Sequence, residues 1–248
     1  MRKFNLLVLN EWLKISKKRS FVIPYAILLV LTLVVGYVAH SVVKDMYSSA
    51  AEYTADMLLP TGMGQVLSIL IIIGTAGIVS KEYSQGSIKF LLIRARSRTS
   101  ILASKYVTVL LYMLSILLVA AAALFISGII FFGVSGGERG LSDILTSLVY
   151  SAVYCTVYST IGFMLGVLTK STGVTIGVTI FATTIDKMII SRDFYKFVLF
   201  PNLDLAVYKD GGAPMPGMTL TFSIVLLCIY MILFLLAGFA VFRRRDVA

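Results

Sequence analysis

The sequence has few of the residues on which catalysis and metal binding depend. It contains one His and two Cys among 248 residues, and only 14% of its residues are charged. Neither an H-E-x-x-H pair nor a G-x-x-x-x-G-K-[ST] phosphate loop occurs. We interpret His40 as an interfacial residue, and Cys155 and Cys228 as packing residues without metal-ligand spacing. We therefore expect no catalytic site, metal site or cofactor on this chain.

Hydrophobic residues are abundant instead. They make up 58% of the chain, and the mean hydropathy of +0.94 lies far above that of soluble domains. A membrane span needs about 20 apolar residues, and five uncharged stretches reach that length. A sixth is short, but Met188, Ile189 and Ile190 extend it past Asp186 and Lys187. We predict an all-α integral membrane protein with six transmembrane helices in a single domain over residues 1–248. The uncharged stretches are 20–43, 57–80, 106–137, 144–169, 171–185 and 211–242.

Basic residues are unevenly distributed between the two sides that six spans define. With both termini inside, the inner segments hold 16 of the 22 basic residues and three of the 12 acidic residues. Short cytoplasmic loops retain Lys and Arg, so this distribution predicts a multi-pass plasma membrane protein with both termini in the cytoplasm. The net charge of +10 then reflects topology, and it gives little reason to expect binding to nucleic acid.

Residues 1–19 have the pattern of an amphipathic interfacial helix. Apolar side chains recur on one face, and polar and basic side chains form a stripe opposite. A Trp at position 12 suits the headgroup layer. The alternative is a basic flank that only orients the first span. The apolar face comprises Phe4, Leu7, Val8, Trp12 and Ile15, and the polar stripe comprises Lys3, Asn10, Lys14 and Lys17.

Residues 191–217 form the longest external segment. It mixes aromatic residues with Pro201, Pro214 and Pro216, and it is too apolar for a free loop. Two interpretations remain open. The segment either returns into the outer leaflet before the last span, or it covers the helix ends as a surface loop.

Small and hydroxyl-bearing residues gather in the fourth and fifth predicted spans. Gly162 with Gly166, and Gly173 with Gly177, have the four-residue spacing that allows close helix contact. Ser, Thr and Tyr residues give each of these spans a polar face. Such a face either lines a pathway or makes hydrogen bonds between helices. The candidates for pathway lining are Tyr154, Tyr158, Thr175 and Thr179.

Residues 81–105 form a compact basic insert between the second and third spans. Six of its residues are Lys or Arg, and Glu82 is its one acidic residue. An apolar block, residues 88 and 90–93, lies inside it. A basic, amphipathic segment fixed by a membrane helix on each side favours docking to a partner at the cytoplasmic surface. The alternative is a basic loop without a partner.

The insert resembles the cytoplasmic segment that follows the second span in the permease subunits of type-2 ABC transporters. Ser87 stands where that pattern has Thr, and Ala95 where it has Pro. The six spans and the amphipathic N-terminal helix also resemble this family. The matching residues are Glu82, Gly86, Leu91, Leu92, Arg94, Ser97, Arg98 and Lys105.

This resemblance implies a coupling helix within residues 81–100 and an exporter without enzymatic activity of its own. Two such permeases, two copies of this chain or this chain with a related permease, would work with two separate cytoplasmic ATPase subunits that bind ATP and Mg. Glu82 would pair with a basic residue of the insert or of the N-terminal helix, so that the two move together. The residues expected to contact the ATPase are Glu82, Gly86, Ile88, Leu91, Leu92, Arg94, Arg96 and Arg98.

The resemblance extends to permeases that expel amphipathic or antimicrobial peptides, including bacteriocin-immunity systems that confer antimicrobial resistance. We therefore expect a peptide or another hydrophobic compound as the exported substrate, taken from the membrane lipids. Two other functions remain open. One is an ion- or proton-coupled carrier, and the other is a membrane sensor or scaffold that transports nothing.

Overall fold

The computed structural model describes residues 2–42, 46–84, 97–134, 136–185, 192–209 and 211–244. Within these residues every regular element is a helix, which confirms the all-α prediction. The elements in chain order are α1 (Arg2–Ser16), α2 (Arg19–Val42), α3 (Ala50–Leu58), η1 (Pro60–Gly64), α4 (Gln65–Thr75), α5 (Gly77–Ser84), α7 (Arg98–Phe132), α8 (Leu141–Thr169), α9 (Thr172–Ile185), η2 (Asp193–Phe197), η3 (Phe200–Asn202), η4 (Leu205–Tyr208) and α10 (Leu220–Arg244).

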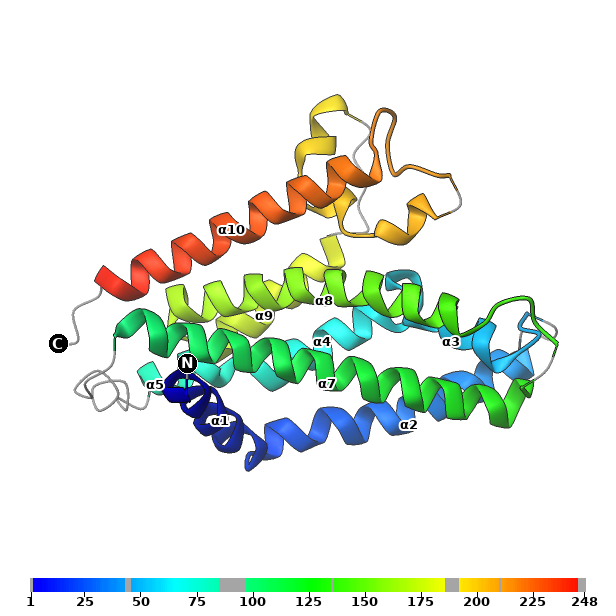
Figure 1. Cartoon of the computed structure of the whole chain (residues 1–248), viewed down its shortest axis with the longest axis horizontal. Coiled ribbons are helices and arrows are strands. Elements are labelled where there is room, and N and C mark those ends of the chain that lie inside the picture. The colour runs from blue at the N-terminus through cyan, green and yellow to red at the C-terminus, as the bar shows by residue number, and fades with distance from the viewer. Residues whose placement is uncertain are drawn as a thin grey trace.

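Five helices are long and apolar enough to cross a membrane. They are α2, the kinked run Pro60–Glu82 (η1, α4 and most of α5), α7, α8 and α10, and they run side by side in one bundle (Figure 1). The fifth predicted span corresponds to α9, which has 14 residues and is therefore about 21 Å long, against a hydrocarbon core of about 30 Å. Its expected extension, residues 186–190, lies outside the described residues, so the sixth span stays a prediction.

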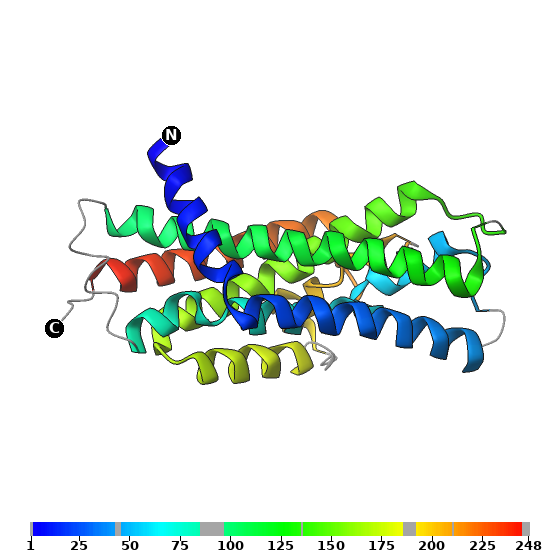
Figure 2. The same ribbon diagram turned by 90° about the horizontal axis from the view of Figure 1, so that it is seen from below.

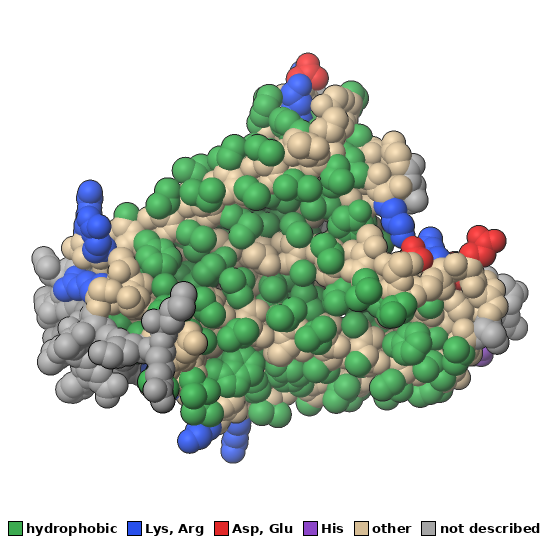
Figure 3. Space-filling model, in the orientation of Figure 1, with side chains coloured by type: hydrophobic (Ala, Val, Ile, Leu, Met, Phe, Trp, Pro, Cys, Tyr) green, Lys and Arg blue, Asp and Glu red, His purple; other side chains and the backbone are tan. Residues whose placement is uncertain are grey.

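The surface of the bundle is apolar. Only 11% of the most hydrophobic window of α10 and 22% of that of α2 is buried within the chain. Hydrophobic side chains cover most of the face in Figure 3, while charged side chains gather at its edges. Exposing such an apolar surface to water costs a free energy of about 25 cal/mol per Å². The exposed helix faces are therefore those of a protein integrated in a membrane.

The predicted N-terminal helix is present as α1, which crosses the bundle at a steep angle to α2 and α7 (Figure 2). Its predicted apolar face, including Trp12 and Ile15, is partly or fully buried, and α1 packs against α7. The Trp12 ring lies edge-on to Phe21 at 5.4 Å between centroids. Lys14 and Lys17 are exposed, as the amphipathic pattern predicts.

The helix α3 lies between the first two predicted spans, where the predicted topology expects an external connection. Ser49 caps its N-terminus, where the hydroxyl accepts a hydrogen bond from the Glu52 amide. It packs closely on α7 because Gly128 has no side chain; a Cβ there would lie 2.9 Å from the Cα of Ala50. The Ser151 hydroxyl of α8 donates to the carbonyl of Leu58. The segment is thus a buried part of the bundle.

The described part of residues 191–217, the segment predicted to be external, folds into η2, η3 and η4, beside the start of α10 (Figure 1). Asn202 is fully buried and holds it together: its Nδ2 donates to the carbonyls of Lys196 at 2.9 Å and Val198 at 2.7 Å. Its Oδ1 accepts from the Ser223 hydroxyl of α10 at 2.7 Å. The segment is therefore anchored to α10, as its apolar composition suggested. Whether it returns into the outer leaflet stays a prediction.

Candidate functional site

Four charged side chains meet where α1, α5 and α7 converge, and we refer to Glu11, Lys14, Glu82 and Lys105 as the ion cluster. The Lys105 ammonium donates to Glu11 Oε2 at 2.6 Å and to Glu82 Oε1 at 2.8 Å. The Lys14 ammonium donates to the same oxygen of Glu82. Lys105 has only 1% of its side chain exposed, and Glu82 has 5%.

Local sequence explains how three helices supply this cluster. Glu11 and Lys14 are three residues apart, which places them on one face of α1. Lys105 lies two turns into α7, whose start is fixed because the Ser97 hydroxyl accepts from the Ser100 amide. Glu82 lies in the last turn of α5. The packing of α1 and α5 on α7 brings these positions together.

The cluster holds two positive and two negative charges, so its formal charge is zero. Burying an unpaired charge is very costly, whereas a buried pair with good hydrogen bonds is tolerated. Around it the surroundings are basic. Burial lowers the pKa of the Lys18 ammonium, and the positive charges of Lys14 and Lys81 lower that pKa further. An acidic group on a partner would be favoured at this end of the bundle.

Two residues of the cluster, Glu82 and Lys105, lie near the two ends of the basic insert (residues 81–105). Within the insert, residues 85–96 lie outside the described residues; Ser84 is the last described residue before them, and Ser97 and Arg98 are the first after them. Arg98 donates from Nη1 to the carbonyl of Arg243 at 3.2 Å, which joins the start of α7 to the end of α10. The other predicted coupling residues, Gly86, Ile88, Leu91, Leu92, Arg94 and Arg96, lie outside the described residues.

The expected pairing of Glu82 with a basic residue is observed twice, with Lys14 of the N-terminal helix and with Lys105 at the end of the insert. The contribution of Glu11 was missed. It is the one acidic residue among six basic residues in positions 1–19, just as Glu82 is the one acidic residue of the insert. An isolated acidic residue in a basic segment indicates a charge pair, and both Glu11 and Glu82 show this pattern in the sequence.

The four candidate pathway residues are buried between helices in this chain. Tyr154, Tyr158, Thr175 and Thr179 are each at most 1% exposed. The Tyr158 hydroxyl donates to the carbonyl of Ala182 of α9 at 3.4 Å. A Cβ at Gly162 would lie 3.5 Å from Thr179 Oγ1, an ordinary contact that leaves room for close packing of α8 on α9. These contacts match the interpretation as hydrogen bonding and packing between helices, and pathway lining stays a prediction.

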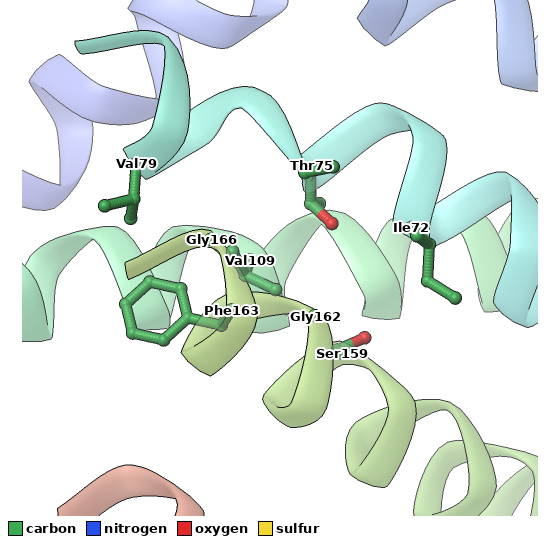
Figure 4. Close-up of a pocket in the computed structure, with 9 residues that line it drawn as sticks. Ile72, Thr75, Val79, Val109, Ser159, Gly162, Phe163 and Gly166 are labelled. Carbon is green, nitrogen blue, oxygen red and sulfur yellow. The ribbon is translucent and has the colours of Figure 1, made fainter. Parts of the chain in front are cut away.

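A small cavity lies where α4 and α5 pack on α7 and α8, lined by Thr75, Val109 and Ser159 among others (Figure 4). Its volume is about 10 Å³, close to the lower limit for one water molecule. It is too small for a substrate. Among the described residues no group of three or more His, Cys, Asp or Glu side chains is placed to hold a metal ion.

Comparison with known proteins shows the family. Residues 13–248 match the family described as Protein of unknown function (DUF2705). The chain is 35% identical to the uncharacterized protein YhcI of Bacillus subtilis (strain 168), over 85% of this chain and 73% of that protein. It is 28% identical to the uncharacterized membrane protein YdbK of the same organism, over 73% of this chain and 78% of that protein. The chain therefore belongs to the DUF2705 family of proteins.

Proposed function

We propose that this chain is the permease subunit of an ATP-driven exporter of the type-2 ABC class, with ATP hydrolysed by a separate cytoplasmic subunit. The observation that carries this proposal is the ion cluster. It joins α1, α5 and α7 at the two edges of the basic insert, where a docked motor would push. A loop without a partner would not need such a connection to three helices.

In this proposal the insert is the docking element. Ile88, Leu91 and Leu92 enter an apolar groove of the ATPase, while Arg94, Arg96 and Arg98 meet acidic groups at its rim or lipid phosphates. ATP and Mg are held by the ATPase, and this chain contributes no catalytic group. Closure of two ATPases displaces the insert, and Glu82 and Lys105 transmit the displacement to α5, α7 and α1 together.

A second permease completes the pathway, and a second copy of this chain is the simplest partner. In Figure 2, α9 lies along one edge of the bundle. Its Gly173 and Gly177 have no neighbouring atom within 4 Å of a built Cβ, and Phe181 is 65% exposed. Gly162 and Gly166 serve packing within the chain, whereas Gly173 and Gly177 are available for close contact with another helix. The pathway residues of α8 and α9 would then lie near the interface between the two copies.

The substrate that fits best is an amphipathic or antimicrobial peptide, or a similar hydrophobic compound, taken from the membrane. The wide apolar surface gives such a compound access from the lipid phase. Among the described residues of the spans outside the ion cluster, few acidic groups are available for a proton or ion relay, which disfavours the carrier alternative. A sensor or scaffold would not need the ion cluster to join three helices at the insert.

The proposal is tested by co-purification of the tagged full chain with an ATPase from its native membrane, followed by ATPase assays in lipid with and without candidate peptides. Wild-type protein should recruit an ATPase whose activity rises with the exported peptide. Leu91→Glu combined with Leu92→Glu should abolish recruitment, while Leu91→Ile with Leu92→Ile should preserve it. Recruitment that survives the Glu substitutions, or no ATPase with the wild type, rejects the proposal.

The Glu82→Gln variant tests the role of the ion cluster in coupling separately from docking of the ATPase. Glu82 is one of the eight residues expected to contact the ATPase, but this variant keeps the other seven, including the apolar anchors Leu91 and Leu92, so it should still recruit the ATPase. It should lose most of the stimulation by peptide, because Lys14 and Lys105 no longer share a carboxylate across the three helices. Full stimulation in Glu82→Gln would show that force does not pass through the cluster.

A further inference from the structure

A cavity of about 460 Å³ opens between α8, α10 and η4, and nothing in the proposed export mechanism uses it. Val153 and Tyr150 line it from α8, Leu205 from η4, and Leu227 and Cys228 from α10. Its lining is almost entirely apolar. A volume of this size lies within the range of about 300–1,000 Å³ typical of small-molecule sites. We call it the α8–α10 groove.

The groove extends along half a membrane. Its lining on α10 runs from Leu220, the first residue of that helix, to Met231. At 1.5 Å per residue this is about 16 Å, close to half of a hydrocarbon core of about 30 Å. Leu220 is the end of α10 remote from the C-terminus. The groove therefore matches the depth of one leaflet, the one on the side opposite the two chain termini.

The size of the groove favours a narrow occupant. A helix of a second copy, about 10 Å across, could pack over the mouth of the groove but is too wide to enter it fully. A single hydrocarbon chain is narrow enough to enter. If the groove were empty, the apolar side chains along its walls would lack van der Waals contacts. Water would not fill it favourably, because these walls offer almost no hydrogen-bond partners.

Charges of both signs lie at the outer end of the groove. Lys209, next to η4, donates to Asp143 Oδ1 at 2.7 Å, and both side chains are partly exposed. Asp143 precedes the groove residue Tyr150 by seven residues, two turns along the same face of α8. An ammonium beside a carboxylate is complementary to a headgroup that carries both a phosphate and an amine.

We propose that the α8–α10 groove binds one acyl chain of a zwitterionic phospholipid from that leaflet, whose headgroup lies against Lys209 and Asp143. The site holds this lipid more tightly than the surrounding bilayer lipids are held. It is a lipid site within the membrane domain, and it does not depend on the chain being an exporter.

Native mass spectrometry of the full chain, extracted in mild detergent from membranes containing phosphatidylethanolamine, tests the site. Wild-type protein should retain one phospholipid. Ala152→Trp, which fills the groove, should lower retention at least tenfold, while Ala122→Trp, on the exposed face of α7, should leave it unchanged. Equal retention in Ala152→Trp and wild type, or no bound lipid in the wild type, overturns the proposal. So does a dimer, without lipid, that dissociates in Ala152→Trp.

Cys228 provides a second readout that does not depend on folding of a variant. It is exposed within the groove, whereas Cys155 is fully buried. A membrane-permeant maleimide should modify Cys228 several-fold faster after the protein is stripped of lipid, and added phosphatidylethanolamine should restore protection. Phosphatidylglycerol, which lacks the amine, should protect less. Reactivity that is the same with and without lipid rejects occupation of the groove.

Discussion

At the scale of single residues, Lys105 is the most deeply buried of the described charged side chains. Its ammonium lies between the carboxylates of Glu11 and Glu82, and only 1% of the side chain is exposed. Water therefore cannot take the place of a carboxylate that is removed. A buried pair adds little net stability when it is intact, but removing one partner leaves an uncompensated charge. The consequences of substitution therefore follow from charge balance more than from size.

Lys105→Met is expected to lower the free energy of unfolding by about 3–5 kcal/mol, because it leaves one excess carboxylate buried in the ion cluster. Adding Glu11→Gln restores neutrality, with Lys14 still paired to Glu82, and should recover more than half of the loss. Thermal unfolding of the full chain in detergent measures both. Lys17→Met, at an exposed position in the turn after α1, is the matched control and should change little. A double variant no more stable than Lys105→Met would contradict the charge argument.

Asn202 is the second residue whose removal should have a large local effect. Asn202→Leu is close in volume but abolishes three hydrogen bonds, to Lys196, Val198 and Ser223. Buried groups left without a partner cost about 1–3 kcal/mol each. We expect limited proteolysis to cleave within residues 192–217 at least tenfold faster than in wild type. Asn10→Leu, at an exposed position of α1, should leave the cleavage rate unchanged.

At the scale of elements, the long helices could be predicted from the sequence because each contains an uncharged apolar run of about 20 residues or more, the length that crosses a bilayer. The pairing of Glu82 was predictable too, because an isolated acid in a basic segment needs a partner. The short helix α3 was not predictable in the same way. Its polar residues, including Glu52 and Asp56, suggest a solvated loop, and only its contacts with α7 and α8 explain its burial. Such contacts join residues far apart in the chain, 78 positions for Gly128 and Ala50, and no local pattern encodes them.

The packing of α3 on α7 gives a prediction at this scale. Gly128→Ala should destabilise the protein by about 1–3 kcal/mol, because the new methyl group would overlap the backbone at Ala50, which cannot rotate away. Gly238→Ala in α10 is the matched control. Its Cβ would meet Met164 at an ordinary 3.8 Å, so it should be neutral or slightly stabilising through helix propensity. Equal unfolding temperatures for the two variants would contradict the close approach of α3.

At the scale of the whole molecule, the bundle is complete on some faces and open on others. The ion cluster and the burial of α8 stabilise a single chain, whereas α9 presents glycines without neighbours at one edge. Over its 14 described residues α9 has an exposed face with two glycines, and such a face gains from a partner helix that covers it. In a twofold dimer whose interface is formed by α9, the two copies of α9 would lie together, with Gly173 and Gly177 of each facing the other.

Replacing both glycines tests this arrangement. Gly173→Leu with Gly177→Leu should weaken self-association in lipid at least tenfold, because the larger side chains keep the backbones apart. The unfolding temperature of the monomer should stay within a few degrees of wild type, since no atom of the chain lies near either built Cβ. Single-molecule photobleaching of labelled protein in vesicles measures the association. Val225→Leu with Ile229→Leu, on the exposed face of α10, is the control and should leave the dimer intact. If the dimer survives the α9 substitutions and dissociates with the α10 substitutions, the interface lies on α10 and not on α9.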